Sequence, residues 1–170
     1  MTTLVSQGQV LWDRLHTLLD CLETSIDAQG SPTPCMTAVF PGAQVAIDYC
    51  NPCGPDQCGM AWVRLASVFP STVFPIQDAT STPCPPPMAV TVDIGIARCA
   101  PVGDDDGNPP STDEWEAATA VQIADMTAIQ DAVLCCFTGK KVVFGAYQPL
   151  GPEGGCVGGV WTVAVDPMSW

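Results

Sequence analysis

The segment that most constrains the fold is residues 88–101, with the sequence MAVTVDIGIARCAP. In an extended chain, alternate side chains point to opposite sides. One side then carries four consecutive β-branched residues, Val90, Val92, Ile94 and Ile96. The other side carries small or polar residues, Thr91, Asp93, Gly95 and Ala97. Prolines at 85–87 and 101 prevent regular pairing at both ends. The pattern predicts a central strand of an antiparallel sheet, with its β-branched face covered by helices.

Two helices are predicted from the spacing of apolar side chains. The first spans residues 4 to about 23 and carries a leucine stripe at steps of three and four, made of Leu11, Leu15, Leu18 and Leu22. The second opens with Ser111-Thr112-Asp113-Glu114, which is a capping box, and runs to about residue 137. Each helix therefore has an apolar face that requires a partner surface.

Further strands are expected on both sides of the central one. Short strands at 37–40 and 45–49 precede a strand at 60–69, and the Cys-rich turn at 50–59 suggests that the last two form a hairpin. Strands at 142–147 and 160–165 complete the set. The sequence predicts one α+β domain over residues 1–170: a mostly antiparallel sheet of about four to five strands, with two helices packed on one face.

Two segments are expected to be irregular. Residues 71–87 contain five prolines and are expected to form an ordered arm or loop that is extended and poor in hydrogen bonds. Residues 148–159 contain five glycines and are expected to form a long hairpin loop. Ordering such a loop costs conformational entropy, so we expect contact with a neighbouring subunit or another partner to order it. The docking residues would be Pro149, Leu150, Gly151, Pro152, Glu153, Gly154 and Gly155.

Composition limits the partners. Hydrophobic residues make up 47% of the chain and charged residues only 14%, so we expect apolar area to be buried against other subunits. Five Lys and Arg against 18 Asp and Glu give a net charge of −13, which argues against gripping nucleic acid through its phosphates. A channel lined by carboxylates would still let DNA pass through without binding it. The candidates for its channel or rim are Asp93, Asp104, Asp105 and Asp106. The alternative for residues 104–106 is an outer surface that only aids solubility.

The cysteines allow three interpretations. Cys50, Cys53 and Cys58 lie in the sequence CNPCGPDQCG, and C-x-x-C-G can fold as a knuckle that binds zinc or iron through thiolates. A fourth ligand would have to come from Cys35, Cys84, Cys99 or Cys156, because a second C-x-x-C is absent. The alternatives are disulfides formed late, outside a reducing compartment, or buried free thiols. Apart from this zinc alternative, we expect no cofactor.

The sequence carries no recognisable catalytic pattern. His16 is the only histidine, it lies among leucines, and no nucleophile motif accompanies it. The first residues have neither a basic segment nor an apolar segment of a signal peptide, and no run is long enough to span a membrane. We therefore expect a non-enzymatic protein that is synthesised in the cytoplasm and has no membrane partner.

Three stretches together resemble the tail terminator proteins of long-tailed, siphovirus-like bacteriophages. They are MAVTVDIGIARCAP, then IADMTAIQ in the second helix, then YQPLGPEGGCVGGVWTVAVD. The resemblance covers most of the chain in order and element type. It implies a virion protein made in the host cytoplasm, which forms a homohexameric ring at the top of the tail tube. Such a ring stops tube polymerisation and joins the tail to the head-tail stopper or connector, while DNA passes through it without specific binding.

Two alternatives to this function remain. One is another neck or tail-tube component, which would share the architecture. The other is a small metal-binding or redox protein centred on Cys50, Cys53 and Cys58.

Overall fold

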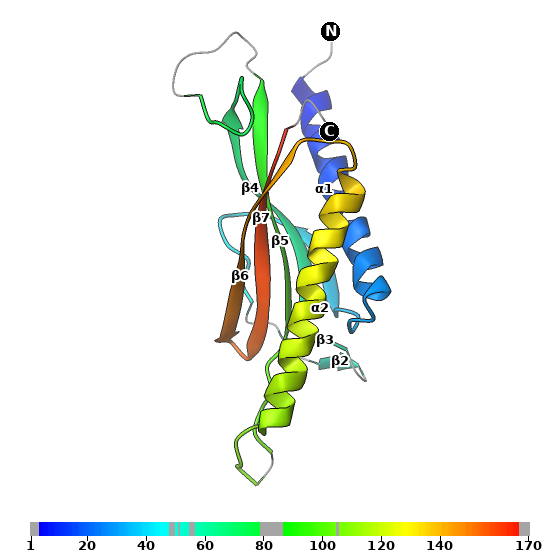
Figure 1. The fold of residues 1–170 in the computed structure, drawn as a ribbon, viewed down its shortest axis with the longest axis vertical. Helices are drawn as coiled ribbons and strands as arrows, with labels where there is room; N and C mark the ends of the chain where they lie inside the picture. Colours follow the sequence, from blue (N-terminus) through cyan, green and yellow to red (C-terminus); the bar gives the residue numbers. More distant parts are fainter. Residues whose placement is uncertain are drawn as a thin grey trace.

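The structure is a computed structural model that describes residues 4–47, 50, 52–54, 57–78, 87–104 and 106–166. Two long helices lie side by side on one face of a five-stranded sheet, and a two-stranded ribbon lies near one end of that sheet (Figure 1). The predicted α+β class is confirmed.

The elements follow one another as α1 (Leu4–Ala28), β1 (Met36–Phe40), β2 (Pro52–Gly54), β3 (Gln57–Cys58), β4 (Met60–Pro70), β5 (Met88–Cys99), α2 (Thr112–Cys136), β6 (Val142–Glu153) and β7 (Cys156–Val165). The main sheet has the order β1-β4-β5-β7-β6, and β2 and β3 form the ribbon. Strands β4, β5, β7 and β6 pair antiparallel, whereas β1 pairs parallel to β4. The sheet is therefore mixed, with its one parallel ladder at the β1 edge.

Strand β5 is the central strand, as its alternation predicts. Its four β-branched residues Val90, Val92, Ile94 and Ile96 are all buried. They belong to one core with the leucine stripe of α1 and the inner face of α2, which contributes Ala128, Ile129, Ala132 and Val133. Burying each such aliphatic side chain contributes about 1.5–3 kcal/mol, so this face supplies most of the stability of the domain.

Both helices form where expected. Helix α1 continues past its predicted end to Ala28 because Ile26 extends the buried stripe by one more turn. At the start of α2, the Ser111 backbone N–H donates to the Glu114 carboxylate at 2.7 Å, and the Glu114 N–H donates to Ser111 Oγ at 3.3 Å. The predicted capping box is therefore confirmed.

The hairpin predicted between 45–49 and 60–69 is wrong. Residues 45–47 are not a strand, and residues 48 and 49 lie outside the described part of the chain. Val45 and Ile47 instead pack against the cluster of Met60, Trp62 and Ala97 on the sheet face opposite the helices. Their alternation therefore reflects packing across a sheet rather than pairing within it.

The long hairpin loop predicted at 148–159 is also wrong. Strand β6 continues to Glu153 and β7 begins at Cys156, so only Gly154 and Gly155 form the turn. Both have positive φ, 57° and 76°, as a tight two-residue hairpin requires. Gly158 serves close packing, since a side chain there would collide with the Ile96 carbonyl. The glycines therefore allow a close-packed strand pair and do not make it flexible.

Candidate interaction surfaces

The loop that leaves β4 is an ordered structure over residues 71–78, so the expectation that it is poor in hydrogen bonds is wrong there; residues 79–86 lie outside the described part. Ser71 Oγ donates to the Ile76 carbonyl at 2.7 Å, and Ile76 N–H donates to the Val73 carbonyl at 2.9 Å. The Asp78 carboxylate accepts from the N–H and the hydroxyl of Thr72, at 2.8 and 3.0 Å. The side chains of Ser71, Thr72 and Asp78 thus form hydrogen bonds within the loop.

The same loop presents apolar side chains outward. Val73 and Ile76 form an isolated bridge and are each 64% exposed. We call residues 73–76 the apolar knob. Because internal hydrogen bonds already hold it, a partner that binds the knob would not have to order it first.

The end of the molecule that carries the knob also collects most of the exposed hydrophobic side chains. Figure 1 places the start of α1, the end of β4 with the β4–β5 loop, the end of α2 and the start of β6 at this end, which we call the arm end. Of the eleven large hydrophobic residues exposed in the described part of the chain, seven lie in these segments: Val10, Trp12, Val68, Val73, Ile76, Leu134 and Val143. The other four are Met36, Val102, Trp115 and Ile123.

The arm end also holds the cations that form no ion pair with another described residue. Arg64 and Arg98 form ion pairs with Asp93 and Asp125, which are the two ion pairs in the described part of the chain. The remaining cations are Arg14 in α1 and Lys140 and Lys141 after α2. Partial burial lowers the pKa of Lys140, and the positive charge of Arg14 lowers it further, so these cations lie near one another.

The opposite end is acidic. It carries exposed carboxylates on the loop before α2, on the first two turns of α2 and at the end of β6: Asp104, Asp106, Asp113, Glu114, Glu116 and Glu153 (Figure 1). Asp104 accepts hydrogen bonds from the Asn108 N–H and side-chain amide, both at 2.8 Å, and these bonds lower the pKa of Asp104. Asp104 therefore both shapes the loop and stays ionised. Asp105 lies outside the described residues.

Asp93 does not belong to this acidic surface, because its carboxylate is buried and paired within the subunit. Asp93 lies on the sheet face opposite the helices and is only 9% exposed. One carboxylate oxygen is paired with the Arg64 guanidinium, and the other accepts from Thr162 Oγ1 at 2.7 Å. The pair lines a groove of about 610 Å³ between the sheet and residues 43–47. The charge of Asp93 is thus neutralised within its own subunit.

The predicted docking residues 149–155 lie on the β6–β7 hairpin near the acidic end (Figure 1). Pro149, Gly151, Pro152, Glu153, Gly154 and Gly155 are exposed, whereas Leu150 is half-buried and packs near Cys156 and Trp62. These residues are thus presented by a structured hairpin tip that contains both prolines and one carboxylate.

The predicted metal site does not assemble. Cys50, Cys53 and Cys58 are bonded in three different disulfides, Cys50–Cys156, Cys35–Cys53 and Cys58–Cys99. Zinc requires thiolates, and a disulfide sulfur is not one. Over the described residues, no group of three or more His, Cys, Asp or Glu side chains is placed to hold a metal. A fourth disulfide, Cys21–Cys136, joins the helices, Cys135 is an exposed thiol, and Cys84 lies outside the described part.

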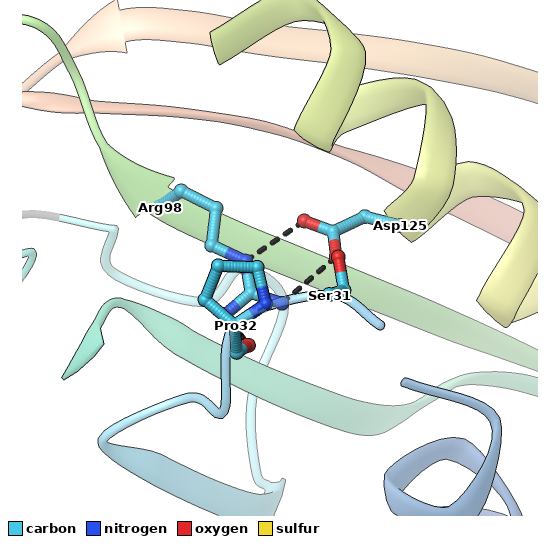
Figure 2. Close-up of polar contacts among 4 residues, drawn as sticks. All are labelled: Ser31, Pro32, Arg98 and Asp125. Atoms are coloured by element: carbon cyan, nitrogen blue, oxygen red, sulfur yellow. Dashed lines mark hydrogen bonds and ion pairs between the residues drawn. The ribbon is translucent and has the colours of Figure 1, made fainter. Parts of the chain in front are cut away.

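A buried charged cluster was missed by sequence reasoning. Asp125 of α2 is 1% exposed and Arg98 of β5 is 6% exposed. Arg98 Nε and Nη2 donate to the two Asp125 oxygens at 2.8 Å each, and Ser31 Oγ donates to the same carboxylate at 2.7 Å (Figure 2). Arg98 Nη1 donates to the Pro32 carbonyl. Every partner is a protein group, so the cluster joins α2, β5 and the α1–β1 linker and is structural.

A signal for this cluster was present in the sequence. Arg98 occupies the next position after Ile96 on the β-branched face of β5, so an ionised side chain points toward the core. A charge at such a position requires a buried partner of opposite sign.

Neither a family model nor a curated protein matches the chain. Across the part of the chain that the structure describes, no helix is long and apolar enough to cross a membrane.

Proposed function

We propose that this protein is a structural component of a bacteriophage virion: a tail terminator that forms a ring on the tail tube, stops tube polymerisation and joins the tube to the neck. The observation that carries the proposal is the difference between the two ends. One end presents an apolar knob together with the cations Arg14, Lys140 and Lys141 and the carboxylates of Asp13, Asp78 and Asp166, whereas the charged groups of the other end are mainly carboxylates. A ring that connects two different structures along one axis needs two chemically different ends.

The arm end is the better candidate for the contact with the tube or a neighbouring subunit. Apolar side chains on a preorganised loop give binding free energy with little entropy loss on association. The acidic end suits a passage or rim for DNA, because carboxylates repel phosphates at short range. The hairpin tip at 149–155 lies near that end, where we propose that it contacts a neighbouring subunit or the head-tail stopper.

Lateral contacts within the ring are proposed along α2. Ile123 is 57% exposed and Leu134 is 53% exposed. They are eleven residues apart, about three helical turns, so they share one side of α2. Extension of the sheet along the β6 edge is less suitable because register shifts at Phe144/Tyr147 and Leu150/Glu153, together with two prolines, interrupt that edge. Contact between different surfaces of identical subunits generates a closed ring when the rotation closes.

The first test is the assembly state of the purified protein, measured by native mass spectrometry and electron microscopy. We expect closed rings of six, and a monomer at high micromolar concentration would refute the ring. In infected cells, loss of a terminator should give tubes of uncontrolled length. Tails of normal length that fail to join heads would instead identify another neck component.

The second test addresses the knob. Val73→Asp with Ile76→Asp should leave the fold intact because neither side chain is buried, but should abolish capping of tubes. Gln77→Asp is the matched control, since it adds a charge at an exposed position of the same loop without removing apolar area. Normal capping by the double variant would exclude the knob as the tube contact.

A further inference from the structure

One irregular segment covers part of the sheet face opposite the helices. It consists of residues 41–47 together with Cys50, and we call it the crossing segment. Val45 and Ile47 pack against a small cluster in which Met60 is 1% exposed and Trp62 is 2% exposed. Removal of the crossing segment would therefore open an apolar strip on the sheet.

Noncovalent interactions hold the crossing segment weakly. Most of its residues are exposed, and Val45 and Ile47 are only half-buried. Arg64 Nη1 donates to the Gly42 carbonyl at 2.9 Å. Within the described part of the chain, residues 43–47 take part in no backbone-to-backbone hydrogen bond. Segments with few buried contacts and few backbone hydrogen bonds have the lowest free energies of local opening.

Covalent bonds hold the same region strongly. Cys50 is bonded to Cys156 at the start of β7, which fixes the end of the crossing segment to the sheet. The ribbon that follows is held by Cys35–Cys53 and Cys58–Cys99, and Cys99 is the last residue of β5. Three disulfides thus gather where noncovalent packing is poorest, whereas the helix-covered face has an extensive core of its own.

We infer that the crossing segment is a redox-controlled cover. It is closed while the Cys50–Cys156 disulfide is intact, and it is released from the sheet when that disulfide is reduced. Reduction by a dithiol transfers two electrons and two protons to the disulfide. It yields the thiols of Cys50 and Cys156 and leaves the reductant as a cyclic disulfide. Reoxidation returns both electrons and both protons to an oxidant of the disulfide class. The inference does not depend on ring formation.

As a consequence, the sheet face opposite the helices presents a different surface in a reducing compartment than in an oxidising one. Under the reducing conditions of a cytoplasm, the strip containing Met60 and Trp62 is available for contact. Under oxidising conditions the cover closes over it. The fold itself persists in both states because the helix-covered core contains none of these three disulfides.

The test compares two disulfide deletions. Cys50→Ser with Cys156→Ser removes the bond that holds the cover, and Cys21→Ser with Cys136→Ser is the control. The two bonds close loops of similar length, with sequence separations of 106 and 115 residues, so their effects on global stability should be similar. Hydroxyl-radical footprinting read by mass spectrometry then reports the accessibility of Met60 and Trp62. We expect a several-fold rise in labelling of both residues in the first variant and none in the control.

Equal labelling in the two variants would overturn the inference. If either variant fails to fold, the intact protein is treated with dithiothreitol instead. The acrylamide quenching of Trp62 is then followed against far-UV circular dichroism, with Trp62→Phe treated in parallel to subtract the other tryptophans. Exposure of Trp62 before any loss of helix supports the cover. Simultaneous change of both signals, or no exposure of Trp62 after full reduction, overturns it.

Discussion

Removing Asp125 from the buried cluster should destabilise the protein more than any surface substitution. Asp125→Ala leaves the Arg98 guanidinium in the interior with the Pro32 carbonyl as its remaining acceptor. Breaking a buried ion pair by deleting one partner costs about 3–5 kcal/mol because the other charge stays buried. At about 2–4 °C per kcal/mol for a domain of this size, Tm should fall by roughly 6–20 °C.

The double variant Arg98→Leu with Asp125→Leu separates charge burial from packing. It removes both charges and leaves only the Ser31 hydroxyl and the Pro32 carbonyl without partners. Each unsatisfied neutral group costs about 1–3 kcal/mol, and small relaxations can let water reach one of them. The double variant should therefore be more stable than Asp125→Ala. Its loss of unfolding free energy should also be much smaller than the sum of the losses of the two single variants.

The assay is urea unfolding followed by circular dichroism under oxidising conditions, with all variants required to show the same m-value. Asp93→Ala is the matched control, since it also removes an aspartate paired with an arginine. The Arg64 and Asp93 side chains are 13% and 12% exposed, so water compensates part of that loss and the cost should be smaller. Two results would refute this reasoning. One is a loss of unfolding free energy below about 1 kcal/mol for Asp125→Ala, and the other is a loss for the double variant that equals the sum of the losses of the two single variants.

Three further predictions concern local features. Gly158→Ala should lower the free energy of unfolding by about 1–3 kcal/mol or more, because the added Cβ would meet the Ile96 backbone. Gly8→Ala should raise it by up to about 1 kcal/mol, because the position in α1 has open space around it. Thermal unfolding of both variants measures the two effects. Ser111→Ala should cost about 1 kcal/mol at neutral pH. Hydrogen bonds from Ser111 lower the pKa of Glu114 below its ordinary 4.5. The part of the stabilisation that comes from the Glu114 carboxylate is therefore present above pH 4.5 and is lost as the pH falls through the lowered value; an acid limb of the stability curve that Glu114→Gln leaves unchanged would contradict it. Alkylation before reduction should label Cys135, while the eight cysteines of the four described disulfides should react only after reduction; peptide mapping checks this.

The parts of the fold that depend on local pattern could be predicted from the sequence. The alternation in β5 and the capping box of α2 each involve residues that are close in sequence, and both are confirmed. The errors arise where one pattern has two physical causes. Alternation at Val45 and Ile47 indicates either a strand or a segment packed on one, and glycines at 158 and 159 indicate either a flexible loop or closely packed strands.

The candidate surfaces could be predicted only in part. The acidic loop was recognised, but the place of Asp93 depends on Arg64, which is brought opposite it by the β4–β5 register. The cysteine pairing depends on the whole topology, since eight cysteines alone allow on the order of a hundred pairings. The segregation of apolar side chains to the arm end required the antiparallel helices and the long strands to be placed in space.

The order of the elements has a consequence for synthesis. The leucine stripe of α1 is made before its partners, which are β1, β4 and above all α2, and α2 ends at Cys136. From Ile26 to Cys136 a further 110 residues must be added, which takes roughly 6–22 s at about 5–20 residues per second. During that interval the stripe lacks its main partner α2, so part of its apolar surface stays exposed and the nascent chain is open to aggregation. The acidic net charge of −13 keeps neighbouring nascent chains apart in the same interval.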